Sequence, residues 1–499
     1  MTGKTTATRT ERDALGEMEI PADAYWGIHT ARALENFRIS RREISVYPDL
    51  IVAYAQVKQA AARANRELGV LDDLRAGLID RACQDIIDGK LRDQFVVGVI
   101  QGGAGTSTNM NVNEVIANRA LELAGRPLGT YAFISPIDHV NRSQSTNDTY
   151  PSALKLALHW ALGRLGAELD LLQFSFATKG REFREIVKIG RTQLQDAVPM
   201  TLGQEFRGFA NSVQADINRL REVRQLLLEL NLGATAIGTG ITAAPGYREE
   251  VIWHLREITD VDDLTIAHDL IEATSDTGVF MTVSSELRRT AMKLSKISND
   301  LRLLSSGPQA GLGEINLPAR QAGSSIMPGK VNPVIPEAIN QVAFVIAGSD
   351  VTVALASEAG QLQLNAFEPV MAHVLLQNSA WLRRAVRSLR VNCVDGISAN
   401  TDRLGAQVST SVGLVTALTP HIGYAQAANL AKEALSGEGT VADLVVEKGL
   451  LTEDEVQEIL DPSGLSNQGP ETLPLPVMTP ELIRTIEEKL DKEDRADRS

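Results

Sequence analysis

The sequence predicts a mainly helical protein built around a bundle of long helices. Apolar residues return every seven positions from Phe206 through Val213 and Leu220 to Leu227, and a second apolar stripe runs beside them. Two apolar stripes within each heptad are typical of a helix packed in a bundle and not of a strand. Segments with this length and pattern cover about 152–186, 206–227, 284–304, 336–364 and 369–394.

The apolar surface of such a bundle indicates an assembly. Five helices of this length cannot easily hide every apolar face inside one compact chain, so we expect the remaining surface to be buried against other subunits. A larger monomeric helical protein is the alternative. The most apolar long stretch, 342–359, is interrupted by Asp350 and Glu358 and does not read as a membrane span.

The chain before the bundle is mixed but mainly helical. An Ala-rich helix is predicted over 49–68 and another helix over 112–124. Between 125 and 151 the helical pattern breaks into turns around prolines and glycines. We therefore place a first domain at 1–146 and the central helix-bundle domain at 147–398.

After the bundle the predicted helices become short. One covers 424–435, and another, 452–460, opens with the Thr-x-x-Glu pattern of a capping box. These helices predict a small C-terminal domain at 399–480. The charged segment 481–499 is predicted to be a tail, with a frayed end from 487 onward.

The charge balance argues against a nucleic-acid surface. The 499 residues carry 49 basic and 63 acidic side chains, a net charge of -14, so a site for a small anion must build its positive potential locally. The only cysteines are Cys83 and Cys393, and the histidines show neither HExxH nor zinc spacing. The polar first twelve residues lack the apolar region of a secretory signal, so we expect a cytoplasmic protein.

The segment 323–333, GSSIMPGKVNP, is the most informative part of the chain. Its glycines permit unusual backbone shapes, its prolines restrict φ, and two adjacent hydroxyls precede a lysine. This mixture suits a loop that closes over a small anion, although ordinary interhelical loops have a similar composition. A phosphate-binding P-loop does not fit, because five residues separate the glycines and Val331 stands where Ser or Thr would hold magnesium.

Three further segments concentrate hydroxyl and amide side chains: 101–109 (QGGAGTSTN), 144–148 (QSTND) and 190–196 (GRTQLQD). A flexible turn, a helix N-cap and an interhelical turn are their ordinary structural explanations. No G-x-S-x-G elbow of a Ser–His–Asp hydrolase is present. The remaining neutral donors, one lysine and two candidate serines could recognise carboxylates and stabilise an anion derived from one.

Together the four segments resemble the aspartase/fumarase superfamily, whose characteristic loop GSSxMPxKxN is matched from Gly323 to Asn332. The resemblance runs from about 15 to about 460. The sequence is more similar to the aspartase subgroup than to class II fumarases, since the second motif reads STND and Gln193 stands where fumarases, and some aspartases, have His. The fragments that carry this closer similarity are 21–29, 101–107, 231–240 and 301–308.

This resemblance implies an all-α protein of three domains that forms a homotetramer. Each subunit of the family contributes its five long helices to a twenty-helix core, and each active site combines motifs from three subunits. The implied enzyme is a carbon–nitrogen lyase that reversibly converts L-aspartate to fumarate and ammonia. No cofactor is expected; magnesium sometimes affects members of the family, but the sequence shows no ligand set for it. Nucleic-acid and membrane partners are not expected.

The resemblance also implies roles for single residues. Ser324 matches the general base, which takes the Cβ proton of the substrate and so forms an enediolate. A neutral amide such as Gln193 cannot exchange protons near pH 7, but it can hydrogen-bond the substrate. Matches to groups that hold the β-carboxylate are Thr106, Ser145, Thr146 and Ser325. Matches to groups that hold the α-carboxylate and amino group are Asn147, Thr192, Lys330 and Asn332, with Gln193 nearby.

Two other functions remain open from the sequence. A class II fumarase would hydrate fumarate to malate on the same scaffold. A non-catalytic structural homologue is a more remote alternative, because the motifs are intact. The products formed from fumarate with and without ammonium would separate these readings.

Overall fold

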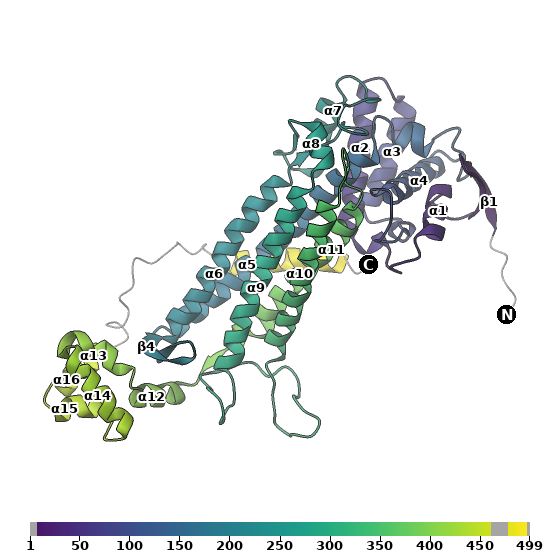
Figure 1. The fold of residues 1–499 in the computed structure, drawn as a ribbon. Helices are drawn as coiled ribbons and strands as arrows, with labels where there is room; N and C mark the ends of the chain where they lie inside the picture. Colours follow the sequence, from purple (N-terminus) through teal and green to yellow (C-terminus); the bar gives the residue numbers. More distant parts are fainter. Residues whose placement is uncertain (1–6, 461–477, 497–499) are drawn as a thin grey trace.

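The protein is all-α, as the sequence predicts, and its centre is a bundle of long helices (Figure 1). The computed structural model describes residues 7–460 and 478–496. One helical domain lies at the upper end of the bundle in Figure 1, and a small helical domain lies beyond its lower end. Within the described residues, the strands form only two-stranded sheets.

Five helices form the bundle, and each overlaps one of the predicted long segments. Helix α5 packs along α6 and α11, and α10 packs along α9 and α11. The heptad residues Phe206, Val213, Leu220 and Leu227 are all buried, which confirms the predicted core face of α6. The bundle helices are α5 (Thr146–Glu182), α6 (Leu202–Leu226), α9 (Gly278–Leu304), α10 (Val334–Glu358) and α11 (Glu368–Asn392).

The N-terminal part packs on the bundle mainly through α2, which contacts α5 as well as α3. It opens with an antiparallel hairpin of β1 (Thr8–Asp13) and β2 (Gly16–Pro21). Its helices are α1 (Ile28–Asn36), α2 (Pro48–Glu67), α3 (Asp73–Ile87) and α4 (Thr106–Leu123).

Two connections complete this end and the opposite end of the bundle. Between α6 and α9, helix α7 (Tyr247–Thr259) packs on α2 and is followed by α8 (Leu270–Ser275). After α5, β3 (Val187–Thr192) and β4 (Gln195–Thr201) form an antiparallel hairpin. The short pairs are β5 (Glu229–Leu230) with β6 (Thr265–Ile266), and β7 (Ile315–Asn316) with β8 (Ser398–Ala399).

The small C-terminal domain has its own apolar core, which includes Leu418, Leu430 and Val445. The predicted capping box opens α16: Glu455 N donates to Thr452 Oγ1 at 3.3 Å, and Thr452 N donates to Glu455 Oε2 at 2.7 Å. The helices are α12 (Thr401–Thr410), α13 (Leu414–Ile422), α14 (Tyr424–Ser436), α15 (Val441–Glu447) and α16 (Glu453–Leu460).

The prediction of a frayed C-terminal end from 487 onward is wrong for residues 487–496, and its last three residues, 497–499, lie outside the described part of the chain. Residues Pro480–Ala496 form helix α18, which returns to the bundle. Arg387 and Arg390 on α11 pair with Asp491 and Glu487, and Leu490 is buried. The acidic composition that suggests a solvated tail instead provides partners for arginines on a distant helix.

Helix α10 keeps a large apolar face that the described part of the chain does not cover. Phe344, Val351 and Leu355 are each about 60% exposed (62%, 58% and 64%). By length and composition alone α10 could cross a membrane, but its other face packs along α9 and α11. A bundle helix with one uncovered apolar face favours burial against further subunits, and the tetramer stays a prediction.

Candidate active site

The first two motifs meet at one end of the bundle, where α4 and α5 begin. Gly103, Ala104 and Gly105 all have positive φ, at 85°, 53° and 90°, and turn the chain sharply into Thr106. A Cβ on Gly105 would overlap the ring of Tyr150 in α5. Only glycine allows both this backbone shape and this close contact, so the glycines place Thr106 beside the start of α5.

The second motif caps α5. Ser145 Oγ accepts from Asn147 N at 3.2 Å, and Ser145 N donates to Asp148 Oδ1 at 3.0 Å, the reciprocal arrangement of a capping box. Ser145 and Asn147 remain partly exposed, whereas Thr146 is buried. The predicted residues Thr106, Ser145, Thr146 and Asn147 therefore lie at neighbouring helix N-termini, where backbone N–H groups favour an anion.

A third segment, 231–240, joins these two motifs. Pro151 has no N–H, so it cannot bond the carbonyl of Asn147 four residues earlier; that carbonyl instead accepts from Asn231 Nδ2 at 3.0 Å. Asn147 Nδ2 donates to Ala236 O at 2.7 Å. The segment 231–240 is one of the fragments that carry the family resemblance, but the sequence assigns no role to any of its residues. Its hydrogen bonds with Asn147 show that it lies beside the second motif.

A network of buried polar side chains joins α2 and α4 to Asn141 at this end of the bundle. Asn141 Oδ1 accepts from Lys58 Nζ at 2.9 Å and from the side-chain amides of Asn109 and Asn113, both at 3.1 Å. Burial lowers the pKa of Lys58 to about 7. Burial also raises the pKa of Asp148 to about 7, against the effect of the backbone N–H donors of Ser145 and Thr235.

The third motif lies at the opposite end of the bundle, at the tip of the β3–β4 hairpin. Gln193 and Leu194 form its two-residue turn with φ of 54° and 64°, and Thr192 and Gln193 are exposed. Strand β3 of the hairpin is held by buried Glu314, whose carboxylate lies 2.7 Å from Lys188 Nζ and 2.5 Å from Arg191 Nη1. The motif therefore projects from a firmly anchored support.

The fourth motif, 323–333, forms a loop at this same end, between α9 and α10. Gly323 N donates to Lys330 O at 2.8 Å, and Asn332 Nδ2 donates to Gly323 O at 3.0 Å, so the base of the loop is closed. A Cβ on Gly323 would lie 2.6 Å from the Lys330 carbonyl oxygen. The glycine is therefore required where the two sides of the loop meet.

Ser324 receives two backbone hydrogen bonds inside this loop. Ile326 N and Met327 N donate to its Oγ at 3.2 and 3.0 Å. Two N–H donors aimed at one hydroxyl oxygen favour its anionic form, which a serine needs to act as a base. Ser325 and Lys330 are exposed, and Lys330 Nζ makes no hydrogen bond or ion pair with the residues that the structure describes.

One chain does not bring the four motifs together. Helix α5 has 37 residues, which at 1.5 Å per residue makes it roughly 55 Å long. Ser145 caps its first turn, while the β3 hairpin that carries Thr192 follows its last turn. Figure 1 shows the start of α5 and the β3–β4 hairpin at opposite ends of the bundle. The residues at the starts of α4 and α5 are Thr106, Ser145, Thr146 and Asn147, and those of the hairpin and of the loop before α10 are Thr192, Gln193, Ser324, Ser325, Lys330 and Asn332.

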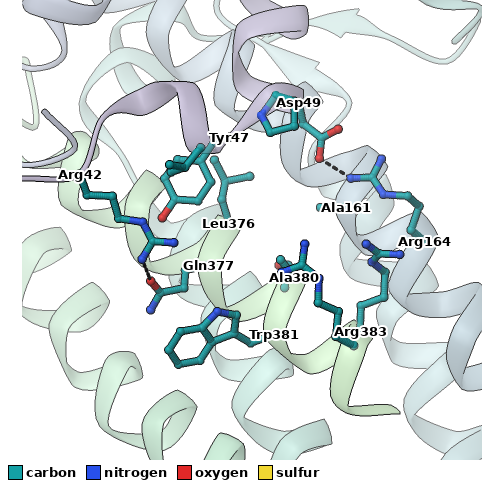
Figure 2. Close-up of a pocket in the computed structure, with 14 residues that line it drawn as sticks. Arg42, Tyr47, Asp49, Ala161, Arg164, Leu376, Gln377, Ala380, Trp381 and Arg383 are labelled. Carbon is teal, nitrogen blue, oxygen red and sulfur yellow. Dashed lines mark hydrogen bonds and ion pairs between the residues drawn. The ribbon is translucent and has the colours of Figure 1, made fainter. Parts of the chain in front are cut away.

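A separate cavity lies where the N-terminal domain meets α5 and α11 (Figure 2). Arg42 donates to Gln377 Oε1 at 2.6 Å on one side, and Arg164 pairs with Asp49 on the other. None of the predicted site residues lines this cavity, so it does not belong to the site described above.

Two protein-family models match this chain. The family model described as lyase matches residues 16–348, and the model described as fumarase C C-terminus matches residues 414–467. An aspartate ammonia-lyase of Pseudomonas aeruginosa is 54% identical over 470 residues, which cover 94% of this chain and 98% of that protein.

Two solved structures share the fold. A Brucella melitensis structure described as fumarate lyase:delta crystallin bound to cobalt has a TM-score of 0.90 and 54% identity, covering 93% of this chain and all of that one. A class II fumarase from Schistosoma mansoni has a TM-score of 0.87 but only 34% identity, over 93% of this chain and all of that one. The sequence is thus more similar to an aspartate ammonia-lyase than to this fumarase.

Proposed function

Since this chain belongs to the aspartase/fumarase superfamily of lyases, we propose that it is an aspartate ammonia-lyase, which reversibly converts L-aspartate to fumarate and ammonia. The observation that carries this proposal is the 54% identity to the Pseudomonas enzyme across nearly the whole of both chains. Gln193 and the Ser-Thr-Asn-Asp second motif support the ammonia-lyase over the fumarase.

The reaction begins with the removal of a proton from Cβ of L-aspartate. Ser324, as an alkoxide, takes this proton, and the electron pair of the C–H bond moves into the neighbouring carboxylate to form an enediolate. The pair then returns to form the double bond between Cα and Cβ, and the Cα–N bond breaks with its electrons leaving on ammonia. This sequence of steps contains no oxidation or reduction, and we propose that it uses no organic cofactor.

The loop supports the basicity of Ser324 by its own backbone. Ile326 N and Met327 N already point at its Oγ, and each such donor contributes about 3 kcal/mol where it meets a developing anion in a site without water. Lys330, in the same loop, supplies a positive charge for a substrate carboxylate. Thr106, Ser145, Thr146 and Ser325 are proposed to hold the β-carboxylate, and Asn147, Thr192, Gln193 and Asn332 to hold the α-carboxylate and amino group.

The complete site is proposed to form between subunits of a homotetramer. The roughly 55 Å length of α5 separates Ser145 from Thr192 within one chain, and the uncovered apolar face of α10 supports association of the bundles. Both cysteines, Cys83 and Cys393, are free and buried, which suits the reducing cytoplasm that we propose as its location.

The direct test is fumarate release from L-aspartate, followed by ultraviolet absorbance. We expect fumarate and ammonia in equal amounts, and L-aspartate as the product when fumarate and ammonium are supplied together. Formation of L-malate from fumarate without ammonium would instead identify a fumarase. Absence of turnover with L-aspartate, fumarate and L-malate would indicate a non-catalytic homologue.

A further inference from the structure

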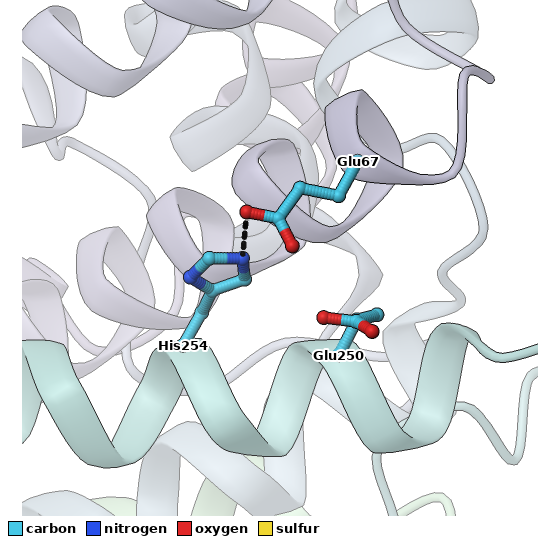
Figure 3. A group of neighbouring side chains, drawn as sticks. All are labelled: Glu67, Glu250 and His254. Carbon is cyan, nitrogen blue, oxygen red and sulfur yellow. Dashed lines mark ion pairs between the residues drawn. The ribbon is translucent and has the colours of Figure 1, made fainter.

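Three potential metal ligands, one of them buried, meet near the surface of the protein, outside the four motifs. Glu67 is the last residue of α2, and Glu250 and His254 lie one turn apart on α7 (Figure 3). Residues four apart share one face of a helix, and this face of α7 is turned toward the end of α2. One ligand atom from each of the three side chains lies within 4.8 Å of the other two.

His254 is the least expected member of this group, because it is buried without a hydrogen bond. The residue is only 3% exposed, and neither of its ring nitrogens has a hydrogen-bond partner among the described residues. Burying a polar group without a partner is unfavourable, because the group loses its hydrogen bonds to water. A buried imidazole that faces two carboxylates and makes a hydrogen bond with neither suggests that a further partner belongs between them.

The distance between Nε2 and Glu67 fits such a partner. Nε2 lies 3.2 Å from Glu67 Oε1, within the range of an ion pair, but no hydrogen bond joins the two groups. Two ligands bound about 2.1 Å from one metal ion, at an angle near 100°, are themselves separated by about 3.2 Å. The separation is that of two neighbouring ligands of one metal.

We propose that Glu67, Glu250 and His254 form a binding site for a divalent transition-metal ion. One imidazole nitrogen and two carboxylate oxygens suit zinc, cobalt or iron better than magnesium, which prefers oxygen ligands alone. The carbonyl end of α2 adds a favourable partial charge for a cation. Glu67 is 40% exposed, so solvent reaches the site and supplies the remaining ligands.

Two neighbouring charged side chains affect this site. Arg66 Nη2 lies 3.7 Å from Glu67 Oε1, so the bound ion must compete with Arg66 for the Glu67 carboxylate. This ion pair is exposed and therefore weak. Glu257 Oε2 lies 3.7 Å from His254 Nδ1, on the side away from Nε2. A small movement of Glu257 would let it accept from Nδ1–H and orient the ring, as carboxylates do for metal-bound histidines.

The bound ion would join α2 to α7 and so stabilise the folded chain. Helix α7 follows the segment 231–240 that contacts Asn147, but none of the three ligands contacts the proposed substrate residues. We therefore expect metal binding to raise the melting temperature, since the ion binds the folded state, and to leave the kcat for L-aspartate unchanged.

The test is titration of the intact protein with Co²⁺, followed by its visible absorption and by the melting temperature. We expect saturable binding of one Co²⁺ per chain, with a melting temperature that rises with Co²⁺ concentration. Glu67→Gln and Glu250→Gln should each weaken binding by about tenfold or more, because loss of even a supporting group weakens metal sites by that factor. Both variants replace accessible side chains, so neither endangers the fold.

The matched control is Glu249→Gln, the same change at an exposed neighbour on α7. This variant should bind Co²⁺ as tightly as the unaltered protein. The proposal is overturned if Co²⁺ fails to bind saturably, if Glu250→Gln binds it as well as the unaltered protein, or if Glu249→Gln loses it to the same degree.

Discussion

A mixture of two inactive variants should regain activity if the site is shared between chains. The two perturbations are Ser324→Ala, which removes the proposed base, and Asn147→Ala, which removes a proposed substrate contact. Within one chain these residues lie at opposite ends of a bundle whose helix α5 is roughly 55 Å long. A substrate the size of aspartate cannot contact both, so the two residues of each site must come from different chains.

The expected recovery follows from random assembly. In an equal mixture, the chain that donates the 323–333 loop has an intact Ser324 half of the time, and the chain that donates 145–147 has an intact Asn147 half of the time. About a quarter of the sites therefore contain both native groups in a symmetric oligomer of mixed chains. A site built within one chain would never contain both.

The assay uses co-expressed variants that carry different affinity tags and are purified on both in turn. Fumarate release from L-aspartate is then measured per site and compared with that of each variant alone. Recovery near a quarter of the native activity supports a shared site. Activity no higher than that of the separate variants, in hybrids shown to contain both chains, would refute the separation argued from the length of α5.

The other predictions concern single positions. Ser324→Ala should lower kcat at least 100-fold, the lower range for a general base, with an unchanged oligomer mass by light scattering; near-normal turnover would exclude Ser324 as the base. Gly105→Ala should lower the free energy of unfolding, measured in urea, by at least about 2 kcal/mol, because the added Cβ would overlap Tyr150. The control Gly125→Ala, which also has positive φ but open space around it, should lower the free energy of unfolding by only about 1 kcal/mol. The pKa of Lys58 falls from 10.5 to about 7 on folding. Between these two pH values the folded state therefore binds fewer protons than the unfolded state. The free energy of unfolding should rise with pH across that window, by at most about 1.4 kcal/mol per pH unit. Lys58→Met should flatten this rise in urea titrations, and an unchanged slope would show that Lys58 stays charged.

The helices of the bundle are predictable because their pattern is local. The heptad from Phe206 to Leu227 indicates α6, whose core positions are buried. The capping box at Thr452 likewise marks the start of α16. In both cases the residues that decide the structure lie within a few turns of one another.

The β3–β4 hairpin shows where local reasoning fails. Its two-residue turn places Gln193 and Leu194 at positive φ, positions where Asn and Gly are the usual signal. Lys188 and Arg191 in β3 pair with Glu314, which lies more than a hundred residues further along the chain and anchors the hairpin. A local sequence pattern does not predict these long-range ion pairs.

The sequence by itself determined the helical periods and the chemistry of each motif, because both depend on residues close together in the chain. Only the tertiary structure decided that Thr106 and Asn147 lie far from Ser324, since helix length converts a separation in sequence into one in space. It also decided that Glu67 and His254, on helices distant in the chain, face one another. Tertiary packing brings such residues together, and their spacing along the sequence does not predict the contact.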